Sequence, residues 1–119
     1  MTALVPQAVA PAEPPDRGDL VWLEFSPHAG HEQAGHRPAL VLSPVAYNRR
    51  RGLVLCCPIT TQVKGHPFEV VLPAGLAVRG AVLADQCKSL DWRARRLQAA
   101  GRAPAATVAD VLGKLRTLL

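Results

Sequence analysis

Short apolar runs at close intervals constrain the fold of this chain more than any other feature. Between residues 19 and 90, each run is only a few residues long and is ended by glycine, proline or a polar segment. Runs of this length, rich in valine and leucine, are typical of β-strands and are too short for ordinary helices. The predicted strands are 19–25, 38–43, 53–59, 68–72, 80–84 and 87–90. The basic stretch 93–101 is either a further edge strand or a loop.

Only residues 104–119 have a clear helical period. Their apolar side chains recur at i, i+3, i+4, i+7 and i+10, which makes one amphipathic stripe. The stripe consists of Val108, Val111, Leu112, Leu115 and Leu118. Pro104 suits a first helical turn, and residues 45–51 are expected to form one short helical turn. The pattern predicts a mainly β fold: a small antiparallel barrel or half-barrel with one packed C-terminal helix.

The length of 119 residues fits a single domain. Residues 1–16 contain four prolines and much alanine, so we expect a disordered N-terminal tail followed by a folded domain at 17–119. Pro58 is expected to make its end of the 53–59 strand an edge or a bulge. No apolar run approaches the ~18 residues of a membrane span, and no secretory signal is recognisable. We therefore expect a cytoplasmic protein.

The formal net charge of +5 favours polyanionic partners such as nucleic acid, although a basic protein without such a partner is an equal alternative. The three cysteines are Cys56, Cys57 and Cys87. An odd count with two adjacent residues does not suit a disulfide framework, and no Cys/His spacing indicates zinc. We expect buried, reduced thiols, and no metal or cofactor.

The segment 32–38, E-Q-A-G-H-R-P, offers the side chains that metal-free RNA cleavage needs. A base must remove the proton of the 2′-OH, a cation must stabilise the pentavalent phosphorane, and an acid must protonate the leaving 5′-oxygen. Glu32 and His36 can exchange protons, and Arg37 can hold a phosphate through its guanidinium. This segment is expected in a loop over 26–37, where such residues are more often simply solvated.

Two further polar segments are candidates for ligand contacts. Thr60 follows a buried strand, so its hydroxyl could bind a phosphate oxygen, and Lys64 could contact an RNA backbone. Gln86 and Lys88 are predicted to share one strand face, where an amide can read a base and a cation can hold a phosphate. Ordinary turn chemistry and a solvated edge strand are the corresponding alternatives. Trp22 could stack on a base or simply pack.

Three segments, taken together, resemble the MazF/PemK-type toxins of the Kid/CcdB superfamily. They are 18–44 (with G-D-L-V-W, E-Q-A-G-H-R-P-A and V-L-S-P), 60–70 (T-T-Q-V-K-G-H-P-F-E-V) and 84–95 (A-D-Q-C-K-S-L-D-W-R-A-R). The resemblance implies an SH3-like small barrel, a homodimer and a MazE-like antitoxin partner. It also implies metal-independent cleavage of single-stranded RNA at short motifs, through a 2′,3′-cyclic phosphate. The RNA would be mRNA, with rRNA or tRNA as alternatives.

The resemblance also implies roles for individual residues. Arg37 would stabilise the phosphorane, Glu32 would be the general base, and Thr60 would bind the scissile phosphate. His36 would assist. The implied RNA contacts are Gln33, Lys64, Gln86 and Lys88.

Two other functions remain open at this stage. A gyrase-poisoning toxin of the CcdB type would need none of the residues Glu32, Arg37 and Thr60. A non-catalytic RNA-binding barrel would present exposed aromatic side chains. Its candidates here are Trp22, Tyr47 and Trp92.

Overall fold

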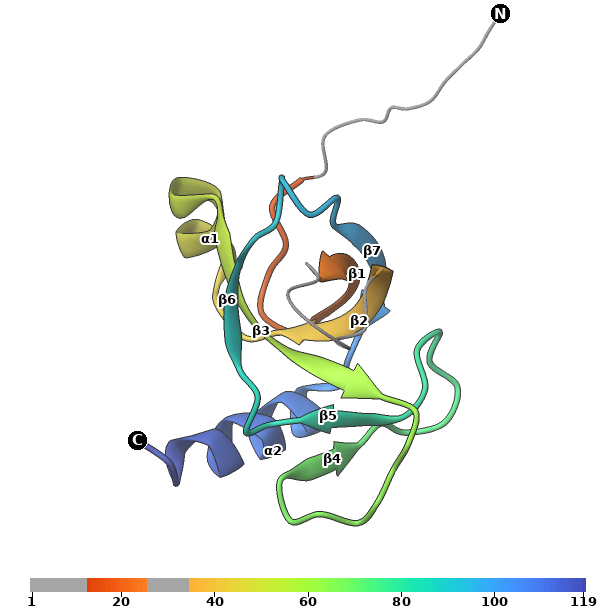
Figure 1. The fold of residues 1–119 in the computed structure, drawn as a ribbon. Helices are drawn as coiled ribbons and strands as arrows, with labels where there is room; N and C mark the ends of the chain where they lie inside the picture. The colour runs from red at the N-terminus through yellow and green to blue at the C-terminus, as the bar shows by residue number, and fades with distance from the viewer. Residues whose placement is uncertain (1–12, 26–34) are drawn as a thin grey trace, which may run out of the picture.

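The computed structural model describes residues 13–25 and 35–119 (Figure 1). In chain order the elements are β1 (Asp19–Phe25), β2 (Gly35–Val41), α1 (Val45–Arg51), β3 (Leu53–Thr60), β4 (Glu69–Val71), β5 (Ala81–Leu83), β6 (Lys88–Asp91), β7 (Gln98–Arg102) and α2 (Ala105–Arg116). The predictions for Glu32, for Gln33 and for residues 1–12 of the tail lie outside the described residues.

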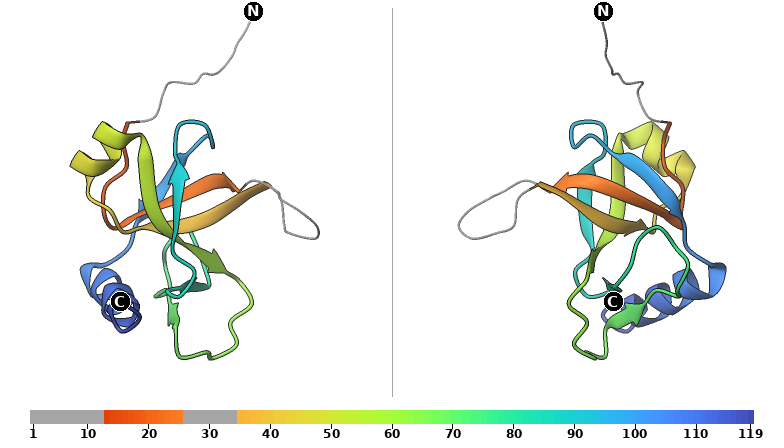
Figure 2. Two further views of the ribbon diagram at one scale, coloured as in Figure 1. Left: turned by 60° about the vertical axis from the view of Figure 1, so that its left-hand side comes forward. Right: turned by 90° about the vertical axis from the view of Figure 1, so that its right-hand side faces the viewer.

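The strands form one antiparallel sheet in the order β4-β5-β3-β2-β1-β7, and β6 also pairs with β3. The sheet curls without closing, and α2 lies beside β4 and β5 at one end of it (Figures 1 and 2). The predicted mainly β fold with a C-terminal helix is therefore confirmed. No helix in the described ranges is both long and apolar enough to cross a membrane.

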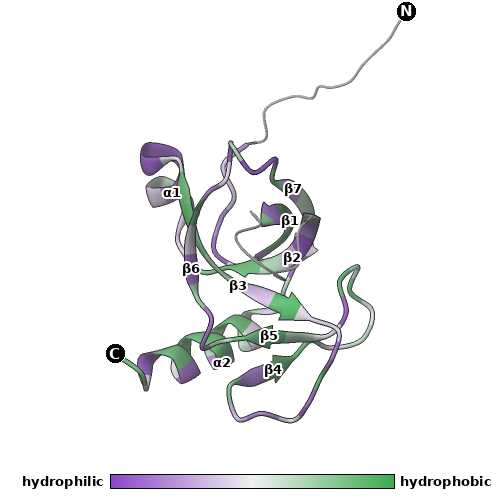
Figure 3. Ribbon diagram, viewed as in Figure 1, coloured by the Kyte–Doolittle hydropathy of each residue, from purple (hydrophilic) through white to green (hydrophobic). Residues whose placement is uncertain are grey.

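Strands β1, β2 and β3 contribute alternate side chains to two separate cores, one on each face of the sheet. The residues of these strands are mostly hydrophobic, as Figure 3 shows by colour. The first core, on the side of α2, β4 and β5, includes Leu20, Leu40 and Ile59. The second core includes Val21, Leu23 and the fully buried Trp92. The indole of Trp92 donates a hydrogen bond to the carbonyl of Asn48 at 2.9 Å. Trp92 is therefore excluded as an exposed stacking platform.

Strand β3 changes partner along one of its edges. Its first half pairs with β6 as far as Cys56, and its last two residues, Ile59 and Thr60, pair with β5. The Leu42 N–H donates to the Leu55 carbonyl, so alternate residues of β3 from Leu55 bond toward β2. The imide nitrogen of Pro58 consequently faces the gap between β6 and β5, where no ladder bond is lost. Pro58 is paired with β2 on one side and with neither β6 nor β5 on the other, so the predicted strand edge is present locally on that second side.

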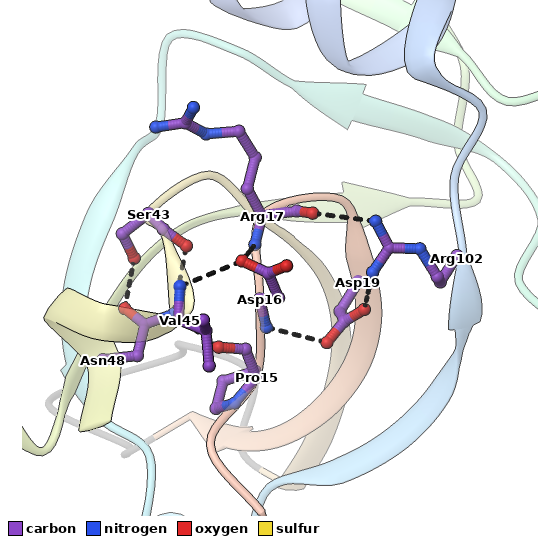
Figure 4. A network of polar contacts seen from close by, with 8 residues as sticks. All are labelled: Pro15, Asp16, Arg17, Asp19, Ser43, Val45, Asn48 and Arg102. Carbon is purple, nitrogen blue, oxygen red and sulfur yellow. Dashed lines mark hydrogen bonds and ion pairs between the residues drawn. The ribbon is translucent and has the colours of Figure 1, made fainter.

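Hydrogen bonds attach the segment before β1 to the start of α1 (Figure 4). The Asp16 carboxylate accepts from the Val45 N–H at 2.9 Å, and the buried Asn48 amide donates to the Pro15 carbonyl at 2.8 Å. These backbone N–H donors, from Val45 and from Arg17, lower the pKa of Asp16. Pro15 and Asp16, which the sequence analysis placed in the tail, thus contact the domain.

Other predicted elements differ in detail from the structure. Strand β2 begins at Gly35, three residues before the predicted start, because pairing with β1 extends that far. The short helix at 45–51 is confirmed. The stretch 93–101 combines both alternatives, since residues 92–96 form turns and β7 begins at Gln98.

Candidate active site

A cleft of about 680 Å³ opens where β2 and β3 diverge. Its walls come from β1 and β2, from the end of β3, and from the loop that leads into β5. It brings together three predicted site residues: His36, Arg37 and Thr60. The lining residues are Trp22, His36, Arg37, Pro38, Ile59, Thr60, Thr61, Gln62, Ala77, Val78, Arg79 and Gly80.

Strand pairing, and not a loop, positions Arg37. Arg37 lies opposite Leu23 of β1, so the prediction of a loop at 35–37 is wrong. The register of β2 against β3 runs through Leu40 opposite Cys57 and Ala39 opposite Pro58. The pairing stops there, and beyond it Arg37 of β2 and Thr60 of β3 line the same cleft. Arg37 is half-buried, and its position is fixed by a paired strand.

Thr60 ends β3 with its hydroxyl oriented by the next turn. Its Oγ1 accepts the N–H of Gln62 at 3.0 Å. Within the described part of the chain its hydroxyl makes no other side-chain hydrogen bond. A hydroxyl can accept and donate at the same time, so the Thr60 proton can be donated to an oxygen of a bound anion.

At Gly80 the backbone of the loop at 72–80 lies in close contact with the backbone of Thr60. A Cβ placed on Gly80 would lie 2.0 Å from the Thr60 carbonyl oxygen, and the φ of +122° is one that only glycine adopts readily. The Gly80 carbonyl in turn accepts the N–H of Leu72 at 2.9 Å. This close approach carries the neighbouring Arg79 into the cleft. The sequence analysis missed Arg79 and Gly80, because a lone arginine before a glycine carries no local signal.

A second cleft of about 370 Å³ shares Thr60 and Gln62 with the first. It also contains the predicted residues Lys64 and Gln86, together with Glu69, which the sequence analysis missed. The Glu69 carboxylate accepts the backbone N–H groups of Lys64 and Gly65 at 3.0 and 2.8 Å. Glu69 therefore organises the loop that separates β3 from β4.

Lys88 is placed apart from both clefts. Its ammonium lies 5.6 Å from the centre of the Phe25 ring, in a cation–π contact. Strand β6 begins at Lys88, so Gln86 precedes the strand and the predicted shared strand face is wrong. Among the described residues, no group of three or more His, Cys, Asp or Glu side chains could hold a metal ion.

The first cleft combines the groups that an extended anionic chain requires. Arg37, Arg79 and the Thr60 hydroxyl offer charge and hydrogen-bond donors to a phosphate. Trp22 is half-buried on β1, and its ring system offers a surface for stacking on a base. Cationic, donor and aromatic groups in one open cleft suit a single-stranded nucleic acid.

Comparisons with known proteins agree on one family. The family model described as PemK-like, MazF-like toxin of type II toxin–antitoxin system matches residues 16–119. The endoribonuclease toxin MazF of Escherichia coli K12 is 62% identical over 81 residues, which are 68% of this chain and 72% of that protein. The endoribonuclease PemK of Escherichia coli is 35% identical over 108 residues, covering 87% and 81% of the two chains. The crystal structure of MazE–MazF (form II) from Deinococcus radiodurans matches with a TM-score of 0.82 at 62% identity, covering 87% of this chain and 94% of that chain.

Proposed function

The chain belongs to the PemK-like, MazF-like endoribonuclease toxins of type II toxin–antitoxin systems, and we propose that it cuts single-stranded RNA at short motifs without a metal ion. The observation that supports this proposal most directly is the convergence of Arg37 and Thr60 in one cleft. Family membership favours this activity over gyrase poisoning and over RNA binding without cleavage.

The first chemical step is attack by the ribose 2′-oxygen on the neighbouring phosphorus. The new P–O2′ bond forms while the P–O5′ bond breaks, so the products carry a 2′,3′-cyclic phosphate and a 5′-hydroxyl. In the proposal the Glu32 carboxylate removes the 2′-hydroxyl proton. The leaving 5′-oxygen takes its proton from His36 or Arg37 at the start of β2.

Arg37 and Thr60 act on the charge that develops on the phosphorane. The guanidinium offers several N–H donors in a fixed plane, which suits it to the equatorial oxygens. The Thr60 hydroxyl adds a donor from the opposite strand, and its orientation is set before RNA binds because Gln62 already occupies one lone pair. Donors that need no reorganisation stabilise a transition state more than flexible donors do.

Lys64, Gln86 and Gln33 are proposed as RNA contacts that extend the site beyond the scissile phosphate. Lys64 and Gln86 line the second cleft, which is joined to the first through Thr60. Lys88 is retained as an RNA contact of lower priority, because it lies outside both clefts. The two clefts, joined at Thr60 and Gln62, together offer space for more than one nucleotide.

The proposal includes a MazE-like antitoxin, a homodimer and a cytoplasmic location. The antitoxin is supported by the MazE–MazF structure to which this chain is similar. An apolar groove of about 470 Å³ between α1 and α2 offers a surface for a second copy. Light scattering of the purified chain measures the mass of the assembly directly.

The test of the activity uses a long single-stranded RNA in excess EDTA. We expect discrete fragments whose 5′ ends are hydroxyls and whose 3′ ends are cyclic phosphates. Arg37→Ala should lower kcat by about 10²–10³-fold, the usual loss for one transition-state donor. Arg50→Ala, on α1, removes the same charge elsewhere and should cleave normally. The absence of fragments in EDTA, or near-full activity of Arg37→Ala, would contradict the proposal.

A further inference from the structure

Two of the three cysteines meet in the same core, while the third faces away. Cys57 belongs to the first core and Cys87 packs against that core. Cys56 belongs to the second core, on the other face of β3. The alternation of side chains along β3 thus separates two adjacent cysteines and directs only Cys57 toward Cys87.

The strand register leads directly up to these two cysteines. Cys56 pairs with Lys88 at the end of the β3–β6 ladder, so Cys57 and Cys87 are the next residues of the two segments beyond it. Cys57 bonds toward β2, and in a regular ladder the Cα atoms at such a non-hydrogen-bonded position lie about 4.5 Å apart. This separation falls inside the range of about 4.4–6.8 Å that a disulfide spans.

Side-chain contacts agree with this placement. The sulfur of Cys57 lies 4.0 Å from the carbonyl oxygen of Ala84, in the bend that carries Cys87. The side-chain interaction with Cys57 lowers the pKa of Cys87, while the interaction with Cys87, together with burial, raises the pKa of Cys57. Burial raises the pKa of Cys56 to about 12. Cys87 is also half-exposed, so it is the thiol most able to react as a thiolate.

We propose that Cys57 and Cys87 form a reversible disulfide when the protein meets a peroxide. The Cys87 thiolate attacks one peroxide oxygen, so that an S–O bond forms, the O–O bond breaks and hydroxide leaves. The sulfur of Cys57 then attacks the Cys87 sulfenic acid, forming the S–S bond and releasing the oxygen as water with the Cys57 proton. The two sulfurs together lose two electrons, and the peroxide is reduced to two molecules of water.

The bond would tie the bend at 84–87 to the middle of β3. Gln86, which lines the second cleft, is the residue next to Cys87 in that bend. The disulfide is thus a modification site at the edge of the proposed RNA-binding surface. The proposed disulfide is inferred from the cysteines themselves, and it does not depend on the proposed ribonuclease activity.

The test counts thiols in the full-length chain. The protein is reduced, freed of reductant, treated with one equivalent of hydrogen peroxide, and alkylated under denaturing conditions. We expect the number of alkylated thiols to fall from three to one per chain, and to return to three after dithiothreitol. Peptide mass spectrometry without reductant should find the peptide with Cys57 linked to the peptide with Cys87.

Variants identify the sulfurs that take part. Cys57→Ala and Cys87→Ser should each abolish the linked peptide, and the half-exposed Cys87→Ser keeps the test valid if the buried variant fails to fold. Cys56→Ala is the matched control and should leave the link intact. Three alkylated thiols after peroxide, over-oxidation of Cys87 without a link, or a link that survives Cys57→Ala would overturn the proposal.

Discussion

Substituting Gly80 tests whether the close contact between the loop at 72–80 and the end of β3 positions Thr60, for which we propose a role in binding the scissile phosphate. In Gly80→Ala the new Cβ would lie 2.0 Å from the Thr60 carbonyl oxygen and 2.8 Å from its carbon. Both atoms belong to the backbone, so no side-chain rotation relieves the overlap. Bringing the oxygen to even the shortest tolerated contact requires a displacement of about 1 Å, and a misplacement of that size costs about 10²-fold in rate.

The expected loss corresponds to about 2.7 kcal/mol of transition-state stabilisation. Alanine at a φ of +122° is also strained, which should lower the free energy of unfolding by about 1–3 kcal/mol. Single-turnover cleavage of a fluorogenic RNA measures the rate, and denaturant unfolding measures the stability. Rates are compared at a temperature where both proteins are folded.

Gly75→Ala is the matched control in the same loop. Gly75 also has a positive φ, of +94°, but its added Cβ would meet nothing within 4 Å. The control should therefore lose stability through backbone strain while it keeps its cleavage rate. If the two variants cleave at the same rate, the contact between Gly80 and Thr60 does not position the site.

Three further changes test other parts of the site and the fold. Arg79→Ala should weaken binding of an uncleavable 2′-deoxy oligonucleotide and lower its salt slope by about 0.7, whereas Arg50→Ala should not; equal slopes would remove Arg79 from the interface. Glu69→Gln should loosen the loop at 61–68, detected as faster proteolysis inside it, and unchanged proteolysis would contradict the role of the carboxylate. The lowered pKa of Asp16 means that its contribution to stability is present above the ordinary value of 3.8 and is lost as the pH falls through the lower folded-state pKa. Asp16→Asn should therefore melt earlier at neutral pH and show a shallower acid-side fall in Tm; parallel pH profiles would argue against this linkage.

Local patterns predicted most of the elements because their causes are local. Strand β1 begins and ends at the predicted residues, since its apolar run is bounded by Gly18 before it and by Ser26 and Pro27 after it. The C-terminal helix follows from one apolar stripe and from Pro104, which precedes its first turn. The start of β2 was missed because pairing with β1, which a single sequence does not display, extends the strand to Gly35.

The residues of the candidate site likewise divide into those that local sequence patterns indicate and those that only long-range contacts bring together. Arg37 and Thr60 were found because motif resemblance points to both, although their placement in one cleft depends on the register between β2 and β3. Gly80 and Arg79 were not found, because their importance comes from a loop pressed against a distant strand end. Glu69 was missed for a related reason: its carboxylate organises a loop through backbone N–H groups that any residue possesses.

The sequence by itself determined the strand-rich architecture, the single long helix and the chemical types of side chain available for cutting RNA. These properties depend on residue identity and spacing along the chain. Only the tertiary structure decided which of those side chains meet. Strand register and loop contacts are long-range pairings, so they place Arg37 with Thr60 and Arg79 in one cleft, and Cys57 beside Cys87, while burying Trp92 in a core and leaving Lys88 outside both clefts.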